Sequence, residues 1–257
     1  EELRSYGIDA PIGNYSFAVS SERERKAVMR FGFNHAGFEL NYGLYNRGSG
    51  IYRAEKYSGI FTLAEDTTFY PHLVLSASHI PTEDSSVAIR SVWDSYFAQG
   101  NKSFTIGTYI VTPGIQFLHE QKASHPLAIP DSLSLRSFRF DQLTPSVDVA
   151  VNPKIKFGAS AEFRSEDSSR NGSFLPISDA VTYRFSSTLA NLSGFSSQLD
   201  VGYRRKDYSD SISKRLNGGD VRSLLLRWIP RYQAANNIIS IDGIYEASEQ
   251  RAARAER

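Results

Sequence analysis

Cysteine is absent from the 257 residues of this chain, and methionine occurs only once. Without thiols the chain has no disulfide, no thiolate metal site and no cysteine nucleophile. Runs of about 18 apolar residues are also missing, which excludes a transmembrane helix. The formal net charge is +1, so no global field of one sign attracts nucleic acid or anionic lipid.

Ring side chains are abundant instead, with 14 tyrosines and 16 phenylalanines. Aromatic residues are enriched in strands. Hydrophobic residues make up 40% of the chain and charged residues 22%, which is typical of a folded protein and not of a disordered one. We therefore predict an all-β fold.

Alternation of apolar and polar residues is clearest after residue 153. It has a period of two at 154–164, 179–189 and 195–204, and this period predicts long strands whose two faces differ. The apolar face would carry Phe157, Phe163, Tyr183, Phe185, Phe195, Leu199, Val201 and Tyr203. The polar face would carry Lys156, Glu162, Arg164, Arg184, Asp200 and Arg204.

The predicted connections alternate in length. Turns at 152–153, 191–194 and 234–237 are short, whereas the connections 165–178 and 209–220 are long and polar. An up-and-down antiparallel meander would place the short turns at one end and the long loops at the other, as in outer-membrane β-barrels. We therefore expect an outer-membrane β-barrel segment, with rings meeting lipid as interfacial girdles and the polar face lining a hydrated lumen.

The N-terminal half has shorter candidate strands and more breakers, among them Pro81, Pro113-Gly114 and Pro130. We predict an irregular all-β region at 1–130, either sandwich-like or formed by the first barrel strands. A barrel-type meander would follow at 131–250, with the boundary near Leu127–Asp131 and a tail at 251–257. The Glu-, Ala- and Arg-rich stretch 246–257 predicts a solvated helix or a frayed end.

Two other architectures fit the same alternation. A soluble or surface-exposed β-sandwich also has one polar and one apolar face, and it would bind glycan or protein through its aromatic residues. Its strands are usually shorter than those predicted here. An open or elongated β-sheet is the third alternative.

Three stretches also carry a resemblance: SLRSFRFDQLTPSVDVAV at 134–151, FSSQLDVGYRRKDYSD at 195–210 and IISIDGIYEASEQRAARAER at 238–257. Together they resemble segments of very large bacterial outer-membrane barrels related to the type IX secretion translocon. The resemblance covers roughly the last half of the chain, and it lies in the sequence of strand, short turn, strand and long loop. It implies a non-enzymatic conduit or scaffold in the outer membrane. Since the chain begins at Glu1, we expect it to be a piece of a longer polypeptide.

Motifs for chemistry are weak. Ser160 lies in a predicted strand and only approximates a G-x-S-x-G elbow, while His119, Glu120 and His125 flank a predicted turn and are a weak metal candidate. Phosphate-binding glycine loops are absent. The basic cluster at 204–206 is too short for a nucleic-acid surface. We therefore expect no catalysis, cofactor, metal or nucleic acid; the expected partners are outer-membrane lipid and either the rest of a larger polypeptide or other envelope proteins. The alternative location is secreted or at the cell surface.

Overall fold

The computed structural model describes residues 4–10, 13–19, 24–33, 35–47, 52–66, 69–85, 88–126, 137–170, 173–209, 219–234 and 237–251. Within these ranges the chain is all-β and contains no helix. The prediction of long antiparallel strands is confirmed.

The first eight strands lie before residue 107. They are β1 (Arg4–Ala10), β2 (Gly13–Val19), β3 (Glu24–Gly32), β4 (Ala36–Arg47), β5 (Tyr52–Leu63), β6 (His72–Asp84), β7 (Ile89–Asn101) and β8 (Phe104–Ile106). The next eight are longer on average. They are β9 (Tyr109–Pro126), β10 (Ser137–Asn152), β11 (Ile155–Arg170), β12 (Ser173–Leu192), β13 (Phe195–Tyr208), β14 (Asp220–Ala234), β15 (Asn237–Ser240) and β16 (Gly243–Arg251).

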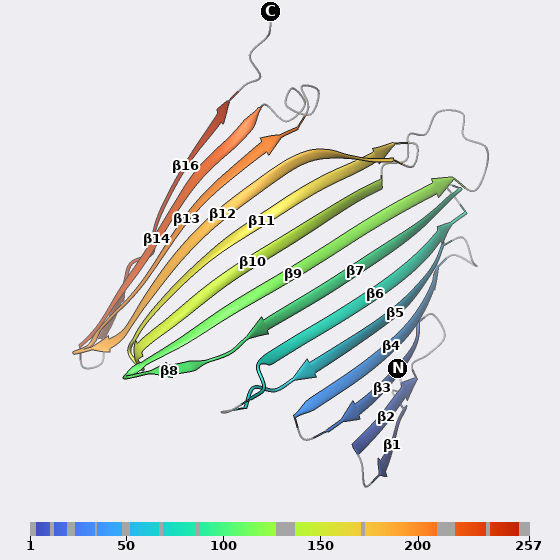
Figure 1. The fold of residues 1–257 in the computed structure, drawn as a ribbon, viewed down its shortest axis with the longest axis horizontal. Helices are drawn as coiled ribbons and strands as arrows, with labels where there is room; N and C mark the ends of the chain where they lie inside the picture. The colour runs from blue at the N-terminus through green and yellow to red at the C-terminus, as the bar shows by residue number, and fades with distance from the viewer. Residues whose placement is uncertain are drawn as a thin grey trace, which may run out of the picture. The chain divides into compact units, whose positions relative to one another are not determined.

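Strand pairing follows the order of the sequence. β1 and β2 form a two-stranded sheet, and the other strands form a fourteen-stranded sheet in the order β15-β14-β13-β12-β11-β10-β9-β7-β6-β5-β4-β3. β16 also pairs with β14, and β8 pairs with β9 (Figure 1). The sheet is an up-and-down meander that is not closed, because no pairing among the described residues joins β3 to β15 or β16.

The chain forms two compact units. Unit 1 comprises Glu1–Gly100, Phe117–Asp141 and Asp167–Leu175, and unit 2 comprises Asn101–Gln116, Gln142–Glu166 and Pro176–Arg257. Both units therefore contain parts of β9, β10, β11 and β12. The predicted boundary near Leu127–Asp131 lies outside the described residues, as does nearly all of the predicted tail.

Several predicted connections are strands in the structure. The long loop predicted at 165–178 is wrong, because β11 continues to Arg170 and β12 begins at Ser173. Pro113-Gly114 does not interrupt β9, and Pro81 lies inside β6. A proline is tolerated where its missing N–H is not needed by the neighbouring strand, so these breakers do not end the strands.

Two stretches are divided by a turn or a break. Residues 104–111 form the β8–β9 hairpin, which turns at Gly107 with a φ of 63°. The stretch 237–251 is interrupted at Ile241-Asp242 between β15 and β16. The helix or frayed end predicted from Glu246 is wrong as far as Arg251, because β16 includes these residues and pairs with β14.

Candidate functional site

The eight ring-bearing and aliphatic residues predicted for the apolar face share one side of unit 2. Tyr183 pairs with Tyr203 and Phe185 with Val201 across β12 and β13, and partners in register lie on the same face. The ring of Phe157 stacks on that of Phe185 with centroids 6.4 Å apart. We name this side the ring face of unit 2. It contains Phe157, Phe163, Tyr183, Phe185, Phe195, Leu199, Val201 and Tyr203.

The ring face of unit 2 continues onto β14. Leu199 lies opposite Trp228, Val201 opposite Leu226, and Tyr203 opposite Leu224. These side chains are exposed or half-buried: Tyr183 is 53% exposed and Trp228 is 49% exposed. No second layer of the described protein covers them.

The six residues predicted for the polar face share the opposite side of unit 2. Arg184 Nη2 lies 3.5 Å from Glu162 Oε2 across β11 and β12. On β13, Asp200 accepts a hydrogen bond of 2.8 Å from Gln198, and Arg204 lies opposite Thr182. We name this side the polar face of unit 2. It contains Lys156, Glu162, Arg164, Arg184, Asp200 and Arg204.

An ionic cluster occupies the end of this polar face. Glu166 Oε2 accepts hydrogen bonds from Lys206 Nζ at 2.7 Å and from Ser178 Oγ at 2.8 Å. The guanidinium of Arg164 lies 2.9 Å from Glu166 Oε1. The alternation in the sequence predicts Arg164 on this face but not Glu166, Ser178 or Lys206, because the polar stretch 165–178 predicts a loop. Only the strand register brings 166, 178 and 206 together.

A hollow interrupts the polar face between β10 and β14. Gly158 permits it, because a Cβ at this position would lie 2.6 Å from Asp148 Oδ1 and 2.7 Å from Ser186 Oγ. Asp148 and Ser186 therefore lean over the Gly158 backbone. Asp200 lines this hollow, and Lys156 lines an adjoining one that shares Asp148, Gly158 and Ser186 with it. The hollow is small, is lined by charged side chains and is open to water, which suits contact with polar solute or solvent.

Burial is inverted relative to a water-soluble sheet. In unit 2 the most buried residues other than glycine are Ser178 at 1% exposed, Ala180 at 7% and Thr182 at 8%, and the β12–β13 register puts all three on the polar face. Ala180 is the only buried hydrophobic residue in the described chain. The polar face of unit 2 thus contains the buried side chains, and the ring face contains the exposed ones.

Unit 1 shows the same inversion. Ser91 is buried, and its hydroxyl lies 2.9 Å from that of Ser124. The Ser137 hydroxyl in turn accepts a hydrogen bond from the Ser124 amide at 3.0 Å. Ser91 lies on the opposite face of β7 from Asp94, because side chains alternate along a strand.

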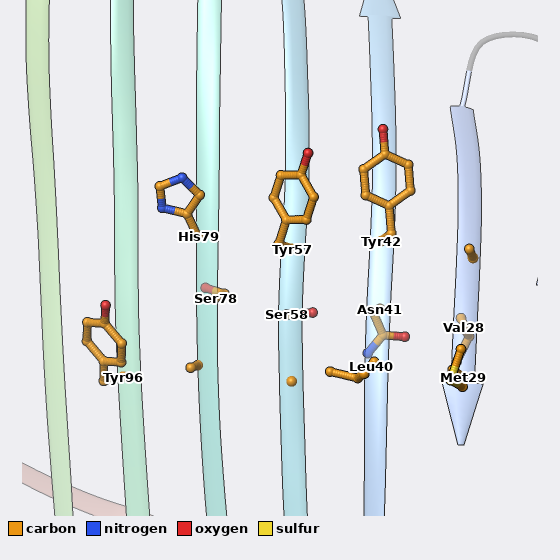
Figure 2. A pocket seen from close by; sticks show the side chains of 13 residues that line it. Val28, Met29, Leu40, Asn41, Tyr42, Tyr57, Ser58, Ser78, His79 and Tyr96 are labelled. Atoms are coloured by element: carbon orange, nitrogen blue, oxygen red, sulfur yellow. The ribbon is translucent and has the colours of Figure 1, made fainter. Parts of the chain in front are cut away.

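A row of rings crosses the other face of unit 1. Tyr42 lies opposite Tyr57, and Tyr57 lies opposite His79; ring centroids are 5.2 Å and 6.3 Å apart. Figure 2 shows the three rings side by side on β4, β5 and β6. We name this side the ring face of unit 1. The sequence does not reveal this row, because its members are far apart along the chain and only the strand register aligns them.

Each of two histidines on this face is paired with an aspartate. His79 Nδ1 lies 2.7 Å from Asp94 Oδ1, and His119 Nδ1 lies 2.6 Å from Asp141 Oδ1. The metal candidate at His119, Glu120 and His125 has no support, since no group of three or more His, Cys, Asp or Glu side chains in the described residues could hold a metal ion.

One further ion pair lies at the break between β15 and β16, which pair with β14 in one continuous register. The guanidinium of Arg227 donates to both carboxylate oxygens of Asp242, at 3.1 Å and 2.7 Å. This hydrogen bonding lowers the pKa of the Asp242 carboxyl. The pair fixes the irregular step at 241–242 against β14.

Comparison of the chain with protein-family models, curated proteins and solved structures finds no match in any of the three. None of the described segments is a helix with the length and apolar character needed to cross a bilayer. The two faces of the strands are therefore the features of this chain that bear on its function.

Proposed function

We propose that this chain is a wall segment of a bacterial outer-membrane β-barrel, acting as a scaffold, pore wall or translocation conduit without bond chemistry. The ring faces meet hydrocarbon and the polar faces meet water. The observation that carries the proposal is the inverted burial, in which Ser178 and Thr182 are buried while Tyr183 and Phe185 are exposed.

The energetics favour this environment for such a sheet. Exposed rings in water forgo about 25 cal/mol for each Å² of apolar surface that is not buried. In a bilayer the lipid tails cover that apolar surface and remove it from water. The charges on the other face of the sheet must face water or one another. Glu166, Lys206 and Arg164 do pair with one another.

Strand length supports the same environment. A tilted transmembrane strand needs about 9–11 residues, and β11 has 16, β13 has 14 and β14 has 15. Strands of this length would cross the hydrocarbon layer and continue into water. The remaining edges of the open sheet would pair with further strands of a larger polypeptide or with another envelope protein, because unpaired strand edges are not tolerated in lipid.

A pair of arginine substitutions on β13 tests the proposal. Leu199→Arg puts a charge on the ring face of unit 2, which costs about 2–4 kcal/mol at mid-depth in a bilayer. The matched control, Gln198→Arg, puts the same charge on the polar face. Refolding the full chain with phosphatidylcholine vesicles and measuring co-flotation should show a large loss for Leu199→Arg and little for Gln198→Arg. Equal flotation of the two variants, or a wild-type chain that folds without lipid and does not float, would contradict the proposal.

A further inference from the structure

The ring face of unit 1 changes character along its strands. Below the ring row, Met29, Leu40, Gly59 and Ala77 form one register row across β3 to β6. The next row in the same direction is apolar as well, with Phe31, Phe38, Phe61 and Leu75. This half of the face carries no charged side chain in either row.

Above the ring row the same face is ionic. Glu55 accepts hydrogen bonds from Arg53 and from the Tyr57 hydroxyl. Two strands along, Arg90 Nη2 lies 3.3 Å from Glu83 Oε2. The rings of Tyr42, Tyr57 and His79 therefore stand at a boundary between a hydrocarbon-like surface and a charged one.

A groove of about 510 Å³ lies on the apolar side of this boundary. Its floor lies below its walls because Gly59 has no side chain and Ala77 a small one, and the walls include Met29, Leu40 and Tyr96. These three walls are exposed, and Figure 2 shows Leu40 and Met29 on one flank and Tyr96 on the other. A Cβ on Gly59 would lie 3.4 Å from Leu40 Cδ2, so little can be added to the floor without filling the groove.

We propose that this groove is a lipid site that holds one acyl chain of a glycerophospholipid, with the headgroup at the level of the ring row. The inference rests on the proposed function, because it requires this face to meet the bilayer. An amphipathic occupant fits, since the groove is apolar while its upper rim presents the His79–Asp94 pair and the Tyr57–Glu55 hydrogen bond. Tyrosine and histidine rings have an apolar body and a polar tip, which suits the headgroup boundary.

Native mass spectrometry of the full chain in detergent tests the site with palmitoyl-oleoyl phosphatidylethanolamine as the probe. Ala77→Leu fills the floor of the groove with aliphatic carbon. Ala161→Leu makes the same change on the ring face of unit 2 and serves as the matched control. Wild type and Ala161→Leu should retain a phospholipid adduct, and Ala77→Leu should retain about tenfold less, equivalent to losing roughly two buried methylene groups.

Vesicle flotation of all three forms separates the two proposals. If all three insert but Ala77→Leu keeps as much lipid as Ala161→Leu, the lipid site is overturned and the proposed function stands. The same conclusion follows if all insert and none retains lipid. If none inserts, both proposals fail. A mass shift from a protein segment in place of a phospholipid would replace the assigned occupant and overturn the lipid site.

Discussion

The two units carry the same inversion of burial but organise their faces differently. In unit 2 the contrast runs through the sheet: rings on one side of β12 and β13, and charges on the other. In unit 1 the contrast also runs along the strands, where apolar rows give way to a ring row and then to ion pairs on a single face. Under the proposed function, such a change in side-chain character along a strand is expected where the strand passes from lipid into water.

Among the substitutions that compare the two units, we expect the largest change in the free energy of unfolding from a glycine at a turn. Gly194 has a φ of 86°, and a Cβ there would lie 2.5 Å from the backbone oxygen of Gln233. Gly194→Ala in unit 2 should therefore lower the free energy of unfolding by about 3 kcal/mol. Its counterpart in unit 1, Gly37→Ala, would meet only the rotatable Thr62 hydroxyl at 2.9 Å and should cost less than about 1 kcal/mol.

Urea unfolding in micelles, followed by circular dichroism, measures both changes. Gly202→Ala is the control within unit 2, because its Cβ would meet only Leu225 Cβ at 3.8 Å. Alanine there should be neutral or stabilising by about 0.5 kcal/mol, since glycine weakens a strand. If Gly194→Ala behaves like Gly202→Ala, the close approach at the turn does not determine the stability of this hairpin.

Removing an ionic contact should also destabilise unit 2 more than unit 1, but the difference between the two units should be smaller than for the glycine substitutions. Glu166→Ala in unit 2 leaves Lys206, whose side chain is 17% exposed, and the buried Ser178 hydroxyl without their acceptor. We expect a loss of about 1–3 kcal/mol in the free energy of unfolding. In unit 1, Glu83→Ala removes an exposed pair with Arg90 and should cost about 0–1 kcal/mol.

Salt dependence sharpens this second comparison. Urea titrations at low and high ionic strength measure this. The small loss in the free energy of unfolding caused by Glu83→Ala should be smaller at high ionic strength, because salt screens exposed pairs. The Glu166→Ala effect should persist. Equal losses in the free energy of unfolding would mean that the ionic cluster around Glu166 is as exposed to solvent and as weakly paired as the Arg90–Glu83 pair of unit 1.

The sequence revealed the strands whose two faces differ most. The alternation at 154–164 identified β11 as far as Arg164, and the residues predicted for each face do share a face. The alternation failed beyond Arg164, because Glu166–Arg170 is polar on both faces. There Lys206 pairs with Glu166 and Arg139 with Asp167. Lys206 lies on β13 and Arg139 on β10, so no local pattern reveals these contacts.

Unit 1 was harder to predict for a second reason. A strand on which one face changes from apolar to ionic side chains loses its alternation midway, as β5 does between Phe61 and Arg53. This loss of period led to the prediction of an irregular region, although β3 to β7 belong to the same fourteen-stranded sheet as the later strands. The ring row likewise depends on register between residues 42, 57 and 79, which a single sequence does not encode locally.

A single-cysteine scan of β13 tests whether the ring face of unit 2 meets lipid while the polar face meets water, and no native cysteine interferes with the labelling. Spin labels at each position from 198 to 204, in the full chain reconstituted in vesicles, report contact with oxygen dissolved in lipid and with a water-soluble nickel chelate. We expect accessibility with a period of two, with 199, 201 and 203 accessible to oxygen and 198, 200, 202 and 204 accessible to the chelate. Uniform access of the chelate to both sets, or labels at 199, 201 and 203 shielded from both reagents by protein, would contradict it.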